Sequence, residues 1–236
     1  MLFKFDNSTI CNVTMNIQEN VSLKSYNTFG IDAKAKWFSS FENLAELEET
    51  LNFKLQTSNS NLVLGGGSNI LLTKDFDGIV LKNDIKGIEI VKEDEDHIYV
   101  KAGAGENWHS FVLYCVNKNY AGVENLSLIP GNIGASPMQN IGAYGVEIKD
   151  VFHELEAFHK QDKTIQKFSL KDCAFGYRES VFKNKYKDQF FITSVTYRLD
   201  KKPSFNTSYG AINKELKRMG VNELTVQAIS QAVINI

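Results

Sequence analysis

The chain has 236 residues, enough for one large domain or two ordinary ones with a substantial core. Its 26 Lys and Arg against 28 Asp and Glu give a formal net charge of -2 without a basic block, so nucleic acid is not an expected partner. The cysteines, Cys11, Cys115 and Cys173, lack disulfide or zinc spacing. No run approaches the ~18 apolar residues of a membrane helix, so we predict a soluble, cytoplasmic protein without a membrane partner.

The N-terminal region predicts one helix after an irregular start. Residues 1–20 are rich in Asn, Thr and Ser and are predicted to form a loosely held extension. Ser39 with Glu42 three residues later matches a capping box. An apolar stripe at helical spacing overlaps this box and predicts a helix; its members are Phe41, Leu44, Ala45 and Leu51.

The next segments predict strands and a second helix. Residues 62–64 are wholly apolar, as expected for a strand buried on both faces, and 78–82 and 97–101 predict further strands. After Asn107, apolar residues fall on one helical stripe that ends near Gly122; they are Trp108, Phe111, Val112, Cys115 and Val116.

The second half of the chain predicts mainly strands, at 151–158, 163–170 and 190–199, and the last of these is expected to alternate between two faces. Residues 223–236 predict a helix with Thr225 as N-cap. This helix lacks a stop signal, which indicates a chain cut inside or just after an element. The fold class is therefore predicted to be α+β.

The first glycine-rich motif, Gly65-Gly-Gly-Ser-Asn69, follows a predicted strand. Its backbone N–H groups, unhindered by Cβ atoms, can cradle a phosphate or pyrophosphate. It is not a Walker loop, and Ile70 stands where a dinucleotide fingerprint needs glycine or alanine. A tight hairpin or bulge explains the glycines equally well.

Two further motifs could bind ligands. The stretch from Leu128 to Gly145 combines glycines, prolines and an amide pair with apolar residues, so it could wrap a flat ligand, or it could be an Ω-loop packed on itself. In Cys173-Ala-Phe-Gly-Tyr-Arg-Glu-Ser180, the fork of Arg178 suits a carboxylate or a developing oxyanion. The alternative is an ion pair between Arg178 and Glu179.

Other titratable residues carry weaker patterns. The histidines, His97, His109, His153 and His159, lack metal-ligand spacing, so no metal site is predicted. The acidic groups at 46–49 and 93–96 are interpreted as solvated faces rather than acid and base catalysts.

Taken in order, the motifs resemble the UDP-N-acetylenolpyruvoylglucosamine reductases, flavoenzymes of peptidoglycan precursor synthesis. The resemblance covers about residues 21 to 236. The matching motifs are Asn27-Thr-Phe-Gly30, Gly65-Gly-Gly-Ser-Asn69, Ala102-Gly-Ala-Gly-Glu-Asn-Trp108, Ile129-Pro-Gly131, Gln139-Asn-Ile-Gly-Ala-Tyr-Gly145 and Phe175-Gly-Tyr-Arg178.

The resemblance implies a two-lobed FAD-binding fold of the vanillyl-alcohol oxidase and p-cresol methylhydroxylase type. The implied lobes are 21–85 and 86–236, with the second incomplete at its C-terminus and a third, substrate-binding lobe absent. NADPH would reduce the FAD, which would then reduce the enolpyruvyl group of a UDP-sugar. We expect a monomer.

The family's functional residues carry over as expectations. Those implied for FAD are Gly65, Gly66, Gly67, Ser68, Asn69, Ile129, Pro130, Gly131, Gly134, Ser136, Gln139, Asn140, Ile141 and Gly142. Arg178 would be catalytic, stabilising the enolate-like charge on the substrate. Tyr144, Tyr177 and Tyr209 would contact the substrate.

The chain departs from the family pattern at its C-terminus. Family members continue through a Gly-Asn-Ala-Gly-Ser-Phe-Phe-like segment, whose serine donates a proton, and later through a glutamate that assists that step. Two alternatives therefore stay open: an FAD-binding fragment that cannot turn over, and an FAD oxidase of another substrate.

Overall fold

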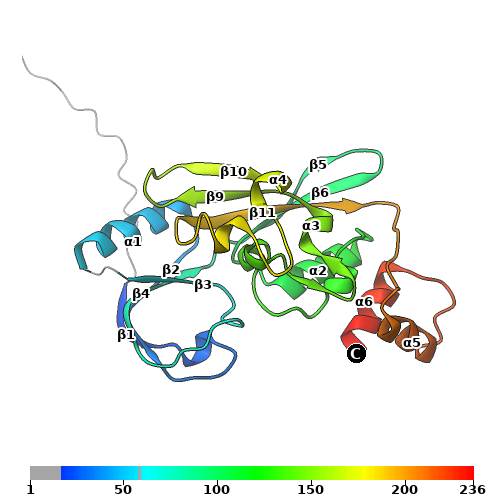
Figure 1. The fold of residues 1–236 in the computed structure, drawn as a ribbon, viewed down its shortest axis with the longest axis horizontal. Helices are drawn as coiled ribbons and strands as arrows, with labels where there is room; N and C mark the ends of the chain where they lie inside the picture. The colour runs from blue at the N-terminus through cyan, green and yellow to red at the C-terminus, as the bar shows by residue number, and fades with distance from the viewer. Residues whose placement is uncertain (1–16, 58–59) are drawn as a thin grey trace, which may run out of the picture.

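The computed structural model describes residues 17–57 and 60–236 (Figure 1). The strands are β1 Gln18–Ser22, β2 Lys34–Phe41, β3 Asn61–Leu64, β4 Phe76–Asn83, β5 Ile88–Glu93, β6 His97–Gly103, β7 Gly142–Ala143, β8 Val146–Glu147, β9 Phe152–His159, β10 Ile165–Ser169 and β11 Phe190–Asp200. The helices are α1 Leu44–Thr57, α2 Trp108–Asn117, α3 Ile148–Val151, α4 Leu170–Cys173, α5 Gly210–Arg218 and α6 Val226–Asn235. Short 3-10 turns are η1 Lys24–Tyr26, η2 Glu124–Leu126, η3 Ile133–Ala135, η4 Pro137–Gln139 and η5 Val181–Lys183.

Two sheets organise the molecule. The first has the order β1-β2-β4-β3 and contains parallel pairs, whereas the antiparallel second sheet has the order β10-β9-β11-β6-β5. In Figure 1 the smaller sheet lies at lower left, the larger one runs across the top, and α5 and α6 lie at lower right. This mixture confirms the α+β prediction.

Helix α2 forms as predicted and supports the larger sheet. The Asn107 side chain caps it by accepting a hydrogen bond from the Ser110 N–H at 2.9 Å. Trp108 is buried against Phe111 and Tyr197, and its indole N–H donates to the Leu126 carbonyl at 2.8 Å. Because the only polar group of this large ring is satisfied, its burial stabilises the core.

The predicted start of the first helix is wrong. Ser39 and Phe41 belong to β2, and Phe41 is fully buried. The helix begins at Leu44, and its capping residues are Asn43, whose Oδ1 accepts the Glu46 N–H at 3.1 Å, and Glu46, whose Oε2 accepts the Glu42 N–H at 2.7 Å. The pairing of β2 with β4 therefore prevails over the local capping pattern. Within the acidic group at 46–49, Glu46 is a helix cap and not simply part of a solvated face.

The predicted strand at 62–64 exists as β3, but it is not buried on both faces. It is an edge strand that pairs with β4 alone, and Val63 is 39% exposed. The interior strands of this sheet are β2 and β4, and Ile79 and Val80 of β4 are fully buried. Strand β4 is hydrogen-bonded to β2 on one side and β3 on the other. Local hydrophobicity could not predict that β4 lies inside the sheet and β3 at its edge.

The predicted N-terminal extension is also wrong in part. Gln18 pairs with Phe38 at the start of β1, so residues 18–20 are part of the smaller sheet. Ile17 packs against the cluster around Phe41, while residues 1–16 of the predicted extension, and with them Cys11, lie outside the described residues.

Strand β11 alternates as predicted from Val195 to Leu199, with Val195, Tyr197 and Leu199 in the main core, but the predicted alternation fails in its first half. Thr193 and Thr196 are 7% and 3% exposed, and the register with β9 shifts between Ile192 and Ser194. Such a shift is a β-bulge, which breaks the two-residue period. Helix α2 covers one face through Trp108 and Phe111, which pack on Tyr197. On the other face, the Glu156 carboxylate of β9 accepts the Ser194 hydroxyl at 3.1 Å and pairs with Lys101 of β6.

The C-terminal helix is confirmed, with Thr225 Oγ1 accepting the Ala228 N–H at 3.0 Å. It packs on η2, where the Ser230 and Ser127 hydroxyl groups are 2.8 Å apart. Helix α5, which the sequence did not predict, packs against α6. In the described part of the chain, no helix has the length and apolar character needed to cross a membrane.

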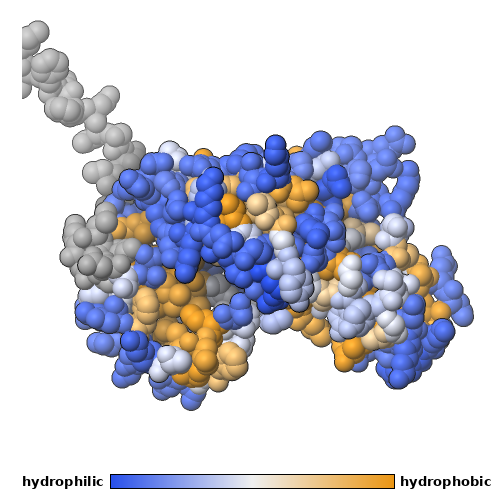
Figure 2. Space-filling model, in the orientation of Figure 1, coloured by the Kyte–Doolittle hydropathy of each residue, from blue (hydrophilic) through white to orange (hydrophobic). Residues whose placement is uncertain are grey.

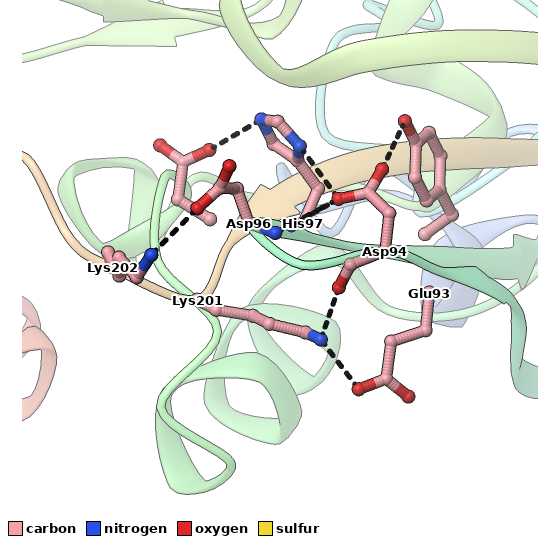
Figure 3. A network of polar contacts seen from close by, with 8 residues as sticks. Glu93, Asp94, Asp96, His97, Lys201 and Lys202 are labelled. Atoms are coloured by element: carbon pink, nitrogen blue, oxygen red, sulfur yellow. Dashed lines mark hydrogen bonds and ion pairs between the residues drawn. The ribbon is translucent and has the colours of Figure 1, made fainter.

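The acidic turn before β6 forms an ion-pair network (Figure 3). His97 lies between Asp94, 3.1 Å away, and Asp200, 3.6 Å away. The hydrogen bond from the His97 backbone N–H lowers the pKa of Asp94 to about 2. With Lys201 and Lys202 bound to the same turn, the network fastens the end of β11 to the β5–β6 hairpin.

Candidate functional site

The glycine triplet lies where backbone segments come together. A Cβ atom on Gly66 would be 2.9 Å from the Gly131 Cα, and one on Gly67 would be 1.9 Å from the Tyr26 carbonyl oxygen. Gly67 also has a φ of +65°, which side chains rarely adopt. Close approach of three loops therefore excludes a side chain at both positions.

The same loop presents free donors. Among the described residues, none of the backbone N–H groups from Gly66 to Asn69 donates a hydrogen bond to a protein acceptor. Four successive free amides, without Cβ atoms on two of them, form a surface suited to an anion. The loop follows β3 and leads to β4, which pairs with β3 in parallel, so it is neither a tight hairpin nor a bulge in a sheet ladder.

A cavity of about 500 Å³ opens beside this loop. Its lining includes nine of the predicted site residues: Ser68, Asn69, Ile129, Pro130, Ser136, Gln139, Ile141, Gly142 and Arg178. It also includes residues that sequence reasoning missed: Trp108, Asn132, Ala135, Met138 and Lys183. The described lining contains two cations and no carboxylate, so the cavity favours anionic ligands.

A second cavity of about 430 Å³ lies between β3 and the segment from η5 to β11. Gly65 and Gly134 line it, with aromatic walls from Phe182, Tyr186 and Phe190. Ala135, Met138 and Lys183 line both cavities, which are therefore adjacent. Figure 2 shows apolar surface over the smaller sheet beside a hollow next to the central part of the molecule.

The alternative considered for Arg178, an ion pair with Glu179, does not form. Its Nη2 donates to Gln139 Oε1 at 3.1 Å, whereas the Glu179 carboxylate accepts the Ser180 N–H. Arg178 has a φ of 55°, an uncommon conformation for a residue with a side chain, which surrounding contacts must hold. One such contact is the Lys183 ammonium, 2.8 Å from the Arg178 carbonyl oxygen.

Two predicted cofactor residues use their side chains within the protein. The buried Asn140 amide donates to the Gly176 carbonyl at 3.0 Å, which joins its loop to the arginine turn. The Ser136 hydroxyl bonds the Ile133 carbonyl and the Tyr197 hydroxyl, each at 2.8 Å. Both side chains shape the cavity wall from behind.

Two of the three predicted substrate tyrosines contact each other. Tyr144 and Tyr209 pack edge to face with ring centroids 5.3 Å apart, beside the α5–α6 pair. Tyr177 is 88% exposed on the arginine turn. In the described structure, none of the three is part of the lining of either cavity.

His109 has a structural contact at the rim. Its Nδ1 accepts the N–H of Leu128 at 3.1 Å, at the start of the long glycine-rich loop. Burial lowers the pKa of His109. Within residues 17–57 and 60–236, no group of three or more His, Cys, Asp or Glu is placed to hold a metal ion.

Comparison with known proteins identifies the family and the cofactor. Residues 37–169, more than half of the chain, match the family model described as FAD binding domain. The chain belongs to this FAD-binding family. FAD is therefore its cofactor, and the amide-rich loop and the cavity without carboxylates fit the two phosphates and the flat ring of FAD.

Sequence relatives of this FAD-binding chain confirm the predicted resemblance. A UDP-N-acetylenolpyruvoylglucosamine reductase of Amoebophilus asiaticus is 54% identical over 94% of the chain, which spans 66% of that relative. The solved reductase of Thermus caldophilus has a TM-score of 0.63 at 19% identity, with 94% of each chain covered. A p-cresol methylhydroxylase structure has a TM-score of 0.53 at 12% identity, covering 81% of this chain and 39% of the other. The predicted fold type is confirmed.

Proposed function

We propose that FAD binds across the two adjacent cavities. The flavin ring would occupy the cavity beside Arg178, the pyrophosphate would meet the amides of 66–69, and the adenosine would occupy the second cavity. The observation that carries this proposal is the position of the glycine loop, since Gly65 lines one cavity while Ser68 and Asn69 line the other. FAD matches that arrangement, because its charged pyrophosphate lies between the flavin and the adenosine.

The lobes are proposed to be 21–85 and 86–236, because this division separates β2, β3 and β4 of the smaller sheet from all strands of the larger one. Among the remaining predicted cofactor residues, Ser136 and Asn140 would contact FAD mainly through backbone atoms, because their side chains are bonded inside the protein. Gln139 would hold Arg178 in addition to lining the flavin cavity.

We propose that the protein is a UDP-N-acetylenolpyruvoylglucosamine reductase, which uses NADPH to convert the enolpyruvyl sugar nucleotide to UDP-N-acetylmuramate. Bound FAD would supply the hydride chemistry. Arg178 would bind the substrate carboxylate with its guanidinium fork and stabilise negative charge that develops there. The names of the close relatives and the cationic cavity support this proposal.

The proposed substrate contacts include Tyr144, Tyr177 and Tyr209. The Tyr144 and Tyr209 pair offers an aromatic surface, while Tyr177 is exposed on the arginine turn. We further propose a monomer that acts in the cytoplasm, where sugar nucleotide and NADPH are available together.

The test is the visible absorption of the purified chain before and after NADPH is added without oxygen. We expect a yellow protein that bleaches. A colourless protein that also takes up no added FAD would contradict the cofactor proposal. Bleaching without loss of the enolpyruvyl double bond would favour an FAD-binding chain that cannot turn over, and turnover of other alcohols with oxygen would favour an oxidase.

Arg178→Ala should lower turnover about 10²- to 10³-fold in a reductase-active preparation, because charge on the substrate carboxylate would lose its donor. Flavin content should not change. Arg178→Lys is the matched control, since it keeps the charge but not the fork, and should recover only part of the rate. Loss of bound flavin in Arg178→Ala would instead assign the arginine a structural role.

A further inference from the structure

Lys183 occupies a position that the proposed function leaves unused. It is one of the three residues that line both cavities, and the other two, Ala135 and Met138, carry no charge. Its ammonium bonds the Arg178 carbonyl, and in the described structure it forms no ion pair with a carboxylate. A full positive charge therefore lies at the junction of the cavities.

The glycine loop lies at the same junction. Its amides supply hydrogen-bond donors and partial charges, but a diphosphate carries full negative charges that amides alone do not neutralise. Arg178 lines only the first cavity, while Lys160 and Lys187, with Asp188, line only the second. Lys183 is thus the cation best placed to face an anion bound at the junction.

Lys183 is also held in place by its own turn. The Ser180 hydroxyl donates to the Met138 carbonyl at 2.6 Å and accepts the Phe182 N–H at 3.3 Å. These bonds fasten the start of η5 to the loop that separates the cavities. A lysine on a fastened turn needs to reorder only its side chain to reach a ligand.

We propose that Lys183 binds the pyrophosphate of FAD opposite the amides of 66–69. This inference rests on the proposed placement of FAD and adds a charged side chain to a site otherwise made of backbone donors. The bond to the Arg178 carbonyl is then a resting contact, which the ammonium shares with or exchanges for a phosphate oxygen.

The competing role is purely positional: Lys183 would only hold the Arg178 carbonyl. The two roles differ in their response to ADP, which contains the diphosphate but no flavin. Binding of ADP and FAD to the flavin-free chain should be measured by titration calorimetry for the wild type and for the variants Lys183→Met, Lys183→Gln and Lys183→Arg. Lys171→Met is the matched control, because it removes the same charge from an exposed position on α4.

We expect Lys183→Met and Lys183→Gln to bind both ADP and FAD about tenfold to a hundredfold more weakly, as for the loss of a charge-assisted hydrogen bond. Lys183→Arg should stay within a few-fold of wild type, and its affinity should keep the salt dependence that the neutral variants lose. Thermal unfolding of each flavin-free variant checks the fold. The two neutral replacements differ in shape, so a packing defect in one is recognised from the other.

Unchanged ADP and FAD affinities in folded Lys183→Met or Lys183→Gln would overturn the assignment and leave the positional role. Equal weakening by Lys171→Met would also overturn it, because net charge alone would then explain the effect. If the wild type binds FAD and the folded variants bind it equally tightly, only the role of Lys183 fails. If the wild type binds neither ligand, the proposed cofactor placement itself fails.

Discussion

Gly30 and Gly67 have nearly the same φ angle but different surroundings. Their φ angles are 64° and 65°, yet a Cβ on Gly30 would meet no atom within 4 Å, whereas one on Gly67 would be 1.9 Å from the Tyr26 carbonyl oxygen. The pair separates the two reasons for which a chain uses glycine: conformational freedom and close approach.

We therefore expect Gly30→Ala to lower the free energy of unfolding by about 1 kcal/mol, the cost of a left-handed conformation. Gly67→Ala should lower it by about 1 to 3 kcal/mol more, because the glycine loop must also move away from the backbone at Tyr26. Urea denaturation of both variants measures the difference. Equal losses would contradict the close packing of the glycine loop against Tyr26.

His109 predicts a pH dependence. Its pKa is lowered from 6.5 by burial, and its neutral Nδ1 accepts the Leu128 N–H. As pH falls below 6.5, His109 is protonated in the unfolded chain before it is protonated in the folded chain. The free energy of unfolding should therefore fall as pH falls from 6.5 to the lower pKa of the folded state, and rise as pH rises over the same range. His109→Gln should reduce that slope when urea denaturation is compared at about pH 5.5 and 7.5. An unchanged slope would contradict this origin.

The α5–α6 pair has a small hydrophobic cluster of its own. Leu216 belongs to it, whereas Val226 at the start of α6 belongs to the main core. Helices that bury most of their apolar residues against each other can open without the rest of the molecule. This element therefore provides a test of local stability.

Leu216→Ala should destabilise the helix pair by about 2 to 5 kcal/mol. Hydrogen exchange should become faster in residues 206–236 and stay slow in β6 and β11. Leu126→Ala, a buried residue of the main core, is the contrasting variant and should accelerate exchange throughout the larger sheet. Equal acceleration everywhere in Leu216→Ala would show one cooperative unit.

At the scale of the whole molecule, the two sheets share a core. Phe191 of β11 lies in one cluster with Leu47 of α1 and Ile79 of β4, and its ring centroid is 6.2 Å from that of Phe41. The Asn83 side chain adds a hydrogen bond of 2.9 Å to the Ile192 carbonyl. The walls of the second cavity are therefore held together by packing.

Phe191→Ala should lower the free energy of unfolding by about 3 to 5 kcal/mol and weaken FAD binding, because the cluster joins both sheets. Phe29→Ala is the control: this side chain is 64% exposed, so its removal should change stability by no more than about 0.5 kcal/mol. Denaturation and flavin titration measure both effects. Intact FAD affinity in a destabilised Phe191→Ala would mean that the shared core does not shape the site.

Elements with a complete local signal were predictable. Helix α2 has both a cap at Asn107 and an uninterrupted apolar stripe, and α6 has the cap at Thr225. The start of α1 was predicted too early. The residues that resemble its cap, Ser39 and Glu42, lie in β2 and in the turn that follows it. Local patterns fail where a long-range strand pairing competes for the same residues.

The candidate site was predictable as a set of segments but not as a set of contacts. The glycine loop, the 128–145 stretch and Arg178 stand out by composition and motif. The partner of Arg178 proved to be Gln139 rather than Glu179. Lys183 carried no signal, because a lysine is notable only when the fold places it between two cavities.

By itself, the sequence determined the chemistry available to this protein: helices where periodicity and caps agree, flexible glycines at the loops, and motifs that identify an FAD-binding family. The tertiary structure alone decided which strands lie inside a sheet, which amides stay free and which cations face the cavities. The physical reason is that propensities and motifs act between neighbours in the chain, whereas burial, clashes and charge placement depend on segments such as 26–30, 65–69 and 128–142 that meet only after folding.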